Sequence, residues 1–461
     1  LLEDSNTDSV SDLTKNIISC QLIDSFEAQH KYLEAVEYFN ECYLFTEDIP
    51  DNGTVHLSYK LKESILLAKI NQIEVAKTNY SKIQNDISHY YENEAVFDPT
   101  EIMSLDASLN YYLGDYKKSI SLFEIIEKRI NENKTLVFDN TLIFAVDYLK
   151  VLRKIGSNEK ALQIAQSLIG NRLESGSLQT MMKKYYILHD FNEIYIDLLI
   201  NNSKIQNKKY LEESFIAAQL SRNSELSQLI QQTIFKISLK DEKLKELIKT
   251  KQTLEYQMNN IFSKNDSASE GLNEDLILQK NKMWDDLNKK LIKINQTISK
   301  SHSDYYELLK PQLITTEQIQ DKLDTNELLF STFTGNEQSY AWFVFKDYLF
   351  VQEINYEKKD LKKIVANLRE GLNQSDIVNA SQLKPFDLNS SHHLYNLMFS
   401  NVKDRMKNIN RIYLVLDGPL QSLPLETLVS EPTINDNYRE ASWLVNDYEL
   451  LYLTGVNDFI S

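Results

Sequence analysis

The chain has 461 residues, of which 42% are hydrophobic and 25% are charged, and Asp and Glu (67) outnumber Lys and Arg (50) to give a net charge of −17 at pH 7. The length suffices for two or three domains with buried cores, and the composition is that of a folded globular protein, so wholesale disorder is excluded. Because a nucleic-acid groove is normally basic, the acidic balance excludes nucleic acid as an expected direct partner.

The sequence opens with LLEDSNTDSV, without an initiator Met and without the charged and apolar parts of a signal sequence. The true start is therefore not shown, and earlier removal of a signal peptide is compatible with the sequence. No run of about 18 apolar residues occurs, and we expect no membrane span. Cys20 and Cys42 are too few for a disulfide framework and lack the spacing of zinc ligands. We therefore expect two buried thiols in the apolar faces of N-terminal helices, and a reducing, cytoplasmic location.

Four stretches near the N-terminus share one plan: HKYLEAVEYF (30–39), NQIEVAKTNY (71–80), GDYKKSISLF (114–123) and GSNEKALQIA (156–165). A turn-like start is followed by a small residue, and four residues later by a residue on the same helix face; the pairs are Ala35 and Phe39, Ala76 and Tyr80, Ser119 and Phe123, and Ala161 and Ala165. A small residue lets two helices approach each other. The period of 41 to 43 residues predicts the second helix of an irregular tetratricopeptide-like repeat, whose usual period is about 34. The alternative is an unrelated helical bundle.

The prolines divide the chain, because only Pro50 and Pro99 precede residue 311 and the other five lie at or after it. This distribution predicts long helices first and turn-rich structure after YYELLKP (305–311). A helical stretch from Tyr210 to about Phe262, the polar break SKNDSASEGLNED (263–275) and a second long helix ending near Ser301 predict a helical hairpin with solvated outer faces.

The last third has the pattern of a sheet with helices. NELLFSTFT (326–334), SYAWFVFK (339–346) and YLFVQEI (348–354) are short and rich in aromatic and β-branched residues, which predicts an antiparallel meander. Helices at about 358–372 and 391–408 precede the strand RIYLVL, and YELLYLT (448–454) is a candidate neighbouring strand. The pattern predicts an α/β sheet covered on both faces, with its chemistry at the carboxyl ends of the strands.

The stretch RIYLVLDGPLQSLPLETL (411–428) joins this strand to a second apolar segment. Asp417 and Gly418 end the strand in a turn, and Pro424 predicts the first turn of a new helix, with Glu426 at its positive end. Asp417, Gln421 and Glu426 have two candidate roles. They cap the turn and the helix start, or they line a substrate pocket in which a carboxylate selects a basic residue.

The histidines do not indicate a metal or a cofactor, and we expect neither. His392 and His393 follow Ser390 and Ser391 at a predicted helix start, and neighbouring residues place their rings on different helix faces. The remaining five are isolated and are interpreted as structural or surface residues: His30, His56, His89, His189 and His302.

Taken in order, four segments resemble a known family: YLEESFIAAQLSRNSELSQLI, LLKPQLITTEQIQDKLDTNELLFSTFTGNEQSYAWFVF, LYNLMFSNVKDRMKNINRIYLVLDGPLQSLPLETL and WLVNDYELLYLT. They are similar to a protein that combines tetratricopeptide repeats with a CHAT domain, a caspase-like cysteine peptidase module related to separase. Leu425 stands where the family often has an aromatic residue. The resemblance implies three regions: all-α tetratricopeptide-like repeats (1–209), long helices forming a hairpin (210–310), and the N-terminal part of an α/β caspase-like CHAT domain (311–461).

The resemblance implies the regulatory, N-terminal part of a cysteine endopeptidase that cleaves a protein substrate. The family's catalytic His lies in a His-Gly segment and its Cys in a Ser-Ala-Cys segment; neither occurs before Ser461. No catalytic residue is therefore assigned in this chain, and both are expected beyond Ser461 or on a C-terminal companion chain. A protein activator or effector complex is expected on the acidic repeat surface, residues 30–260. The alternative is a non-catalytic tetratricopeptide scaffold with a degenerate peptidase fold.

Overall fold

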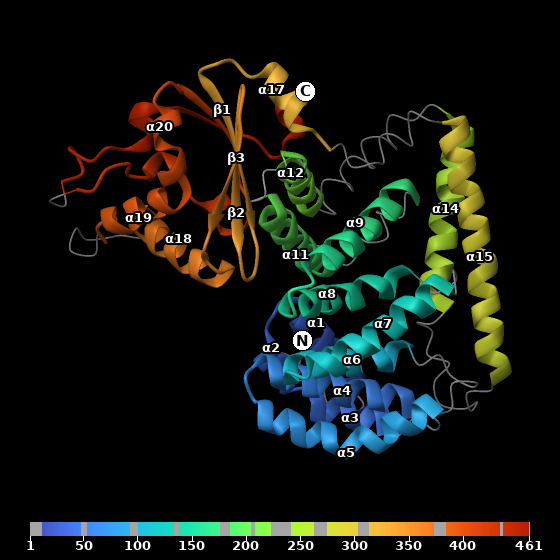
Figure 1. The fold of residues 1–461 in the computed structure, drawn as a ribbon. Coiled ribbons are helices and arrows are strands. Elements are labelled where there is room, and N and C mark those ends of the chain that lie inside the picture. Colours follow the sequence, from blue (N-terminus) through green and yellow to red (C-terminus); the bar gives the residue numbers. More distant parts are fainter. Residues whose placement is uncertain are drawn as a thin grey trace. The chain divides into compact units, whose positions relative to one another are not determined.

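The computed structural model describes residues 12–47, 53–92, 100–132, 138–175, 185–203, 208–222, 241–261, 274–302, 313–372, 384–433 and 437–460 (Figure 1). The chain forms two compact units: Leu1–Ala161 with Leu229–Lys310, and Leu162–Gln228 with Pro311–Ser461. The first unit is helical, and the second contains a five-stranded mixed sheet with helices. Within the described ranges, no helix combines the length and the apolarity that a membrane crossing needs.

The described part of the first unit is helical. Its helices are α1 (Asp12–Ala28), α2 (Tyr32–Val36), α3 (Phe39–Glu47), α4 (Gly53–Lys69), α5 (Ile73–Glu92), α6 (Thr100–Leu113), α7 (Tyr116–Glu132), α8 (Phe138–Lys154), the start of α9 (Asn158–Ser175), α14 (Glu242–Ile261) and α15 (Glu274–Ser301).

The four predicted repeat turns have the same backbone geometry. His30, Asn71, Gly114 and Gly156 adopt positive φ angles between 57° and 87°. Each following residue donates its backbone N–H to the carbonyl five residues earlier, at 2.8–2.9 Å. These are the features of a helix that ends in a left-handed residue, after which the next helix begins at once. The helix-turn-helix character of the four stretches is therefore confirmed.

The small residue of each repeat is fully buried. Ala35, Ala76, Ser119 and Ala161 are all 0% exposed, and the Ser119 hydroxyl donates to the Ala107 carbonyl of α6 at 2.8 Å. The residues four positions later are also buried: Phe39, Tyr80, Phe123 and Ala165. Ala35, Ala76 and Ser119 thus mark points where the second helix lies close to the first.

A larger side chain at one of these points should strain the repeat. We expect Ala76→Leu to lower the free energy of unfolding by about 1–3 kcal/mol, because the added atoms have no space in a packed contact. Val75→Leu, at the neighbouring 48% exposed position, is the control and should change stability little. Urea unfolding of both variants measures the difference, and equal stability of the two would contradict the close-packing role of Ala76.

The cysteines differ from the expectation. Both side chains are buried, at 6% and 0% exposure, as predicted. However, Cys20 in α1 and Cys42 in α3 form a disulfide, with their Cα atoms 4.9 Å apart. The interpretation as two separate thiols is wrong, because the turn through α2 returns the chain onto α1. Spacing along the sequence does not reveal that proximity.

The predicted helical hairpin is confirmed by the packing of α14 on α15. Leu244 and Ile248, near the start of α14, are buried against Ile298, near the end of α15, so the helices are antiparallel. The stretch predicted to be helical from Tyr210 to about Phe262 contains two helices, α12 (Lys208–Arg222) and α14. The segment between them lies outside the described residues. So does most of the predicted polar break.

The second unit contains the rest of α9, then α11 (Tyr185–Ser203), α12, α17 (Thr316–Lys322), β1 (Glu327–Thr334), β2 (Ser339–Phe345), β3 (Leu349–Ile354), α18 (Lys358–Leu372), α19 (Leu388–Phe399), η2 (Ser400–Val402), α20 (Lys403–Met406), β4 (Arg411–Val415), η3 (Gly418–Ser422), η4 (Leu425–Thr427), α21 (Leu444–Asp447), β5 (Glu449–Tyr452) and α22 (Asn457–Ile460). The strand order is β3-β2-β1-β4-β5. The predicted antiparallel meander is confirmed in β1, β2 and β3, and β4 pairs in parallel with both β1 and β5.

Helices cover both faces of the sheet, as predicted (Figure 1). On one face, Leu328, Phe330, Phe343 and Leu414 form a core with α18 and α19. On the other, Trp342 donates to the Ser214 hydroxyl of α12 at 3.0 Å, and its ring lies 6.3 Å from that of Phe215. The helices on this second face come from residues that the predicted domain boundaries placed outside the sheet domain. Those boundaries assigned residues up to 209 to the repeats and 210–310 to the hairpin. Residues Leu162–Gln228 are in the same unit as the sheet.

The helix predicted after the Leu-Pro pair is wrong. Two short 3₁₀ segments, η3 and η4, occupy the region, and Pro424 precedes η4 in an extended conformation with ψ 112°. Leu420, Leu423, Leu425 and Leu428 are all buried in the main core of this unit. Their uneven spacing does not follow the period of 3.6 that would place them on one helix face. A regular helix would place Leu423 and Leu425, two residues apart, on nearly opposite sides, whereas the two short segments bury both in the same core.

Candidate functional site

Asp417 joins the carboxyl ends of β1 and β4. Its carboxylate accepts the backbone N–H of Thr334 at 2.8 Å, and its own N–H donates to the Thr332 hydroxyl at 2.9 Å. The Thr334 hydroxyl donates to the Asp417 carbonyl at 3.1 Å. Gly418 follows with φ +55°, and a Cβ on it would lie 2.9 Å from the Cβ of Thr334. Only glycine fits that approach without strain.

His189 reaches the same threonine from α11. Its Nε2 lies 3.1 Å from the Thr334 carbonyl, and its ring stacks on Phe333 with centroids 5.0 Å apart. Because a carbonyl only accepts, Nε2 must carry the proton. Burial lowers the pKa of His189, and the charge of Lys358 lowers it further, against the opposing charges of Asp417 and Asp190. Burial thus favours the neutral imidazole, although the bond to the Thr334 carbonyl acts in the opposite direction, and His189 is a buried structural residue.

Glu193 and Asp197, four residues apart on α11, form hydrogen bonds with the hairpin between β1 and β2. Glu193 is 8% exposed, and its carboxylate accepts the backbone N–H groups of Asn336, Glu337 and Gln338 at 2.7–2.8 Å. Asp197, one turn further on, accepts the Tyr340 hydroxyl at 2.8 Å. Burial raises the pKa of Glu193, although the three N–H donors act in the opposite direction.

His189, Asp190 and Glu193 also have the spacing of metal ligands, with donor atoms within 4.8 Å of one another. The bonds already present do not fit a cation. Glu193 accepts three N–H groups, Asp190 accepts the Asn336 amide at 2.8 Å, and His189 Nε2 donates to a carbonyl. These N–H donors occupy lone pairs of the carboxylates that a cation would need, and they stabilise the negative charge by hydrogen bonding. We interpret the group as a hydrogen-bonded joint between α11 and the hairpin.

Gln421 and Glu426, the other two predicted site residues, also bond within the chain. Gln421 donates to the Leu416 carbonyl of its own loop at 3.1 Å. Glu426 accepts the Tyr452 hydroxyl at 2.6 Å, while that hydroxyl accepts the Leu425 N–H at 2.7 Å. Asp417 thus bonds to β1, Gln421 to its own loop and Glu426 to β5. The three side chains have different partners and do not bond to a common group. The contacts support the structural role, and the substrate-binding role stays a prediction.

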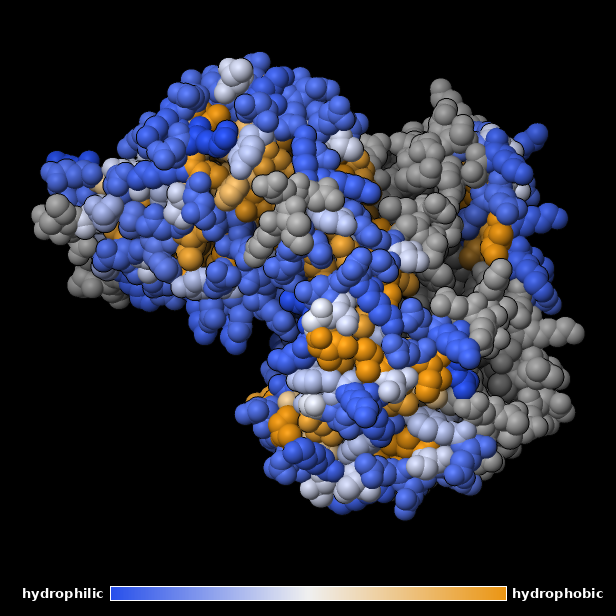
Figure 2. Space-filling view, in the orientation of Figure 1, coloured by the Kyte–Doolittle hydropathy of each residue, from blue (hydrophilic) through white to orange (hydrophobic). Residues whose placement is uncertain are grey.

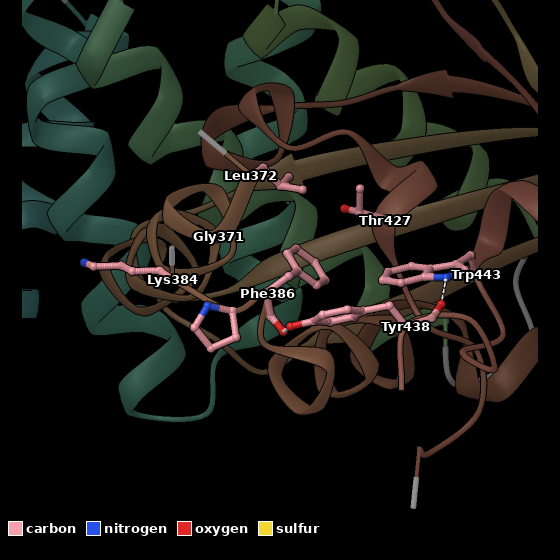
Figure 3. Close-up of a pocket in the computed structure, with 8 residues that line it drawn as sticks. Gly371, Leu372, Lys384, Phe386, Thr427, Tyr438 and Trp443 are labelled. Atoms are coloured by element: carbon pink, nitrogen blue, oxygen red, sulfur yellow. Dashed lines mark hydrogen bonds between the residues drawn. The ribbon is translucent and has the colours of Figure 1, made fainter. Parts of the chain in front are cut away.

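Beside Glu426 the surface is hollowed into a pocket of about 420 Å³ (Figure 3). Its lining comes from the end of α18, the segment before α19 and the connection between β4 and β5: Gly371, Leu372, Lys384, Pro385, Phe386, Thr427, Tyr438 and Trp443. The Phe386 and Trp443 rings contact each other with centroids 5.8 Å apart. Sequence patterns did not indicate this pocket, because its three aromatic residues lie in connecting segments without a common period.

His392 and His393 lie at the start of α19, near this pocket. His392 Nδ1 is 2.9 Å from the Val429 carbonyl, and His393 Nε2 is 2.8 Å from the Tyr356 hydroxyl. The two rings therefore have separate partners. Asp387, which accepts the Ser390 N–H at 2.9 Å, caps the helix.

No protein-family model matches the sequence, and no curated protein is significantly similar to it.

Proposed function

We propose that the chain is the regulatory, N-terminal part of a caspase-like cysteine endopeptidase. The observation that supports this most is the parallel arrangement of β1, β4 and β5 with the Asp417 loop at the carboxyl ends of β1 and β4. Substrates of open α/β sheets bind outside the carboxyl ends of the strands. The sequence resemblance assigns residues 411–428 to the border of a substrate cleft, which is compatible with that position.

The proposed reaction is attack of a cysteine thiolate on a peptide carbonyl, with a histidine as acid and base. Cys20 and Cys42 are joined in a buried disulfide and neither is a thiolate. We propose that the nucleophile and its histidine come from the family's His-Gly and Ser-Ala-Cys segments outside this chain. Neither a cofactor nor a nucleic-acid or membrane partner is part of the proposal.

The test is cleavage by the protein expressed from its complete coding sequence. We expect cleavage of a peptide library that iodoacetamide abolishes, and we expect the variant C20S/C42S to remain sensitive to the same reagent. The chain 1–461 alone should show no cleavage. Cleavage that depends on Cys20 or Cys42 would contradict the proposal, and so would a complete protein that adds no thiol-dependent cleavage to that of the native extract used to activate it.

We further propose that a protein activator or effector complex docks on residues 30–260. Hydrophobic residues form separate patches within a mainly hydrophilic surface (Figure 2). On the repeats, Leu33 of α2 and Val75 of α5 are 59% and 48% exposed. Replacing both with Glu should reduce activation of the complete protein by a native extract, without changing its thermal stability. A deletion variant that removes the repeats should end at Ala161, because α11 belongs to the sheet unit.

A second candidate is a non-catalytic scaffold that only binds proteins. It is favoured by the internal bonds of Asp417, Gln421 and Glu426, which tie the strand-end loop to its own chain. The two proposals differ in one result. The scaffold binds its partner in the complete protein without any cleavage that iodoacetamide can abolish.

A further inference from the structure

We propose that the pocket beside Glu426 binds an aromatic side chain that carries a hydrogen-bond donor, tryptophan first and tyrosine second, presented by an extended segment of another protein. The inference is independent of the peptidase assignment, because it rests on the pocket's own chemistry. Its volume of about 420 Å³ lies in the range of sites that take small ligands.

The lining residues that the structure describes leave the interior of the pocket uncharged. Lys384 is the one ionisable cation among them, and it extends away from the three rings (Figure 3). Its Nζ pairs with Glu370 at 2.5 Å, and its side chain is 67% exposed. A charged ligand group inside would lose its water without gaining an opposite charge. The rings of Phe386, Tyr438 and Trp443 instead offer stacking and edge contacts to another aromatic ring.

The polar side chains of the lining have already donated their hydrogens within the protein. Trp443 Nε1 donates to the Tyr438 carbonyl at 2.9 Å, the Tyr438 hydroxyl donates to the Phe386 carbonyl at 3.2 Å, and the Thr427 hydroxyl donates to the Pro424 carbonyl at 2.7 Å. A hydroxyl oxygen that has donated its proton still has lone pairs. The pocket therefore presents acceptors at Tyr438 and Thr427, and the complementary ligand supplies a donor. An indole N–H or a phenol O–H meets this requirement, and a phenyl or alkyl side chain does not.

The surroundings favour a protein segment over a free small molecule. Leu372 and Tyr438, at the rim, are each 41% exposed. Exposed apolar side chains next to a pocket give the residues that flank an anchor further surface to contact. Buried aromatic anchors with such neighbours are the usual energetic centres of protein recognition.

The experiment uses the whole chain and ligand-observed saturation-transfer NMR with titration. The probe is N-acetyl-tryptophanamide. Its matched analogue is the benzothienylalanine derivative, in which sulfur replaces the indole N–H. We expect the tryptophan probe to bind about tenfold more tightly than the analogue, the ratio for one hydrogen bond of about 1.4 kcal/mol. N-acetyl-phenylalaninamide should bind like the analogue, and N-acetyl-lysinamide should give no signal.

Variants assign the effect to the pocket. Tyr438→Phe and Thr427→Val each remove one acceptor and retain the shape, so at least one should reduce the tenfold ratio to near unity. Trp443→Ala should abolish binding, whereas Tyr348→Phe, at a 38% exposed tyrosine in the turn before β3, should leave it unchanged. Circular dichroism and thermal unfolding of each variant show which ones remain folded. Equal binding of probe and analogue to the unmodified chain, or undiminished binding to folded Trp443→Ala, would overturn the proposal.

A peptide distinguishes the source of the ligand. The pentapeptide Ala-Leu-Trp-Leu-Ala, blocked at both ends, should bind at least severalfold more tightly than N-acetyl-tryptophanamide, because its leucines contact the rim. If the peptide binds no better than the single amino-acid amide, the protein-segment part of the inference is wrong.

Discussion

Glu193→Ala is expected to lower the free energy of unfolding of the sheet unit by about 3–5 kcal/mol. The substitution removes a buried carboxylate that accepts three backbone N–H groups of the hairpin turn. Each polar group left without a partner away from water costs about 1–3 kcal/mol, less where water reaches it. Gly335 shows how closely the turn lies on this carboxylate, because a Cβ there would be 2.6 Å from Glu193 Cδ.

Two further variants make this expectation specific. Glu193→Gln keeps one acceptor oxygen and should cost less than the alanine variant. Glu337→Ala changes an exposed side chain of the same turn and should stay within about 0.5 kcal/mol of the unmodified protein. Chemical unfolding gives the stabilities, and hydrogen exchange should accelerate at the amides of residues 336–338 in Glu193→Ala alone. If Glu193→Ala is no less stable than Glu337→Ala, the hairpin does not depend on α11.

Cys42→Ser is expected to lower the free energy of unfolding of the helical unit by about 3 kcal/mol. The Cys20–Cys42 disulfide closes a short loop, with a sequence separation of 22, and so restricts the unfolded chain. Dithiothreitol should lower the stability of the unmodified protein by a similar amount and should not affect Cys42→Ser. Unfolding with and without reductant measures both effects. If reductant does not change the stability of the unmodified protein, the disulfide does not contribute to folding.

The same disulfide tests the predicted cytoplasmic location. Disulfides persist in oxidising compartments and are rare in reducing ones. Alkylation of protein purified under trapping conditions, followed by mass spectrometry, reports whether the two thiols are paired in the cell. Alkylation of both cysteines would agree with the predicted reducing compartment. If neither cysteine is alkylated, the thiols are paired in the cell and the predicted compartment is contradicted.

Features that depend on local spacing were readable in the sequence. The repeat stretches around Ala76 and Ser119 combine a turn, a small residue and a residue one helical turn later, all within ten positions. The strands of the meander carry dense aromatic and β-branched residues. Such patterns depend on the backbone period and on burial of one face, which neighbouring residues specify among themselves. The helical first part and the mixed sheet after it were therefore predictable from sequence.

Tertiary structure decided the features that need partners from distant segments. The sequence pattern of α11 and α12 assigned them to the helical region, but their buried faces meet the sheet, where His189 and Asp417 bond to the same Thr334. The Leu-Pro segment has the residues of a helix start, yet burial of four unevenly spaced leucines makes two short turns of it. The disulfide and the aromatic pocket likewise join positions with no common period. Sequence determines which residues seek burial or a partner, and only the folded chain determines which partner they find, because that choice depends on packing between segments remote along the chain.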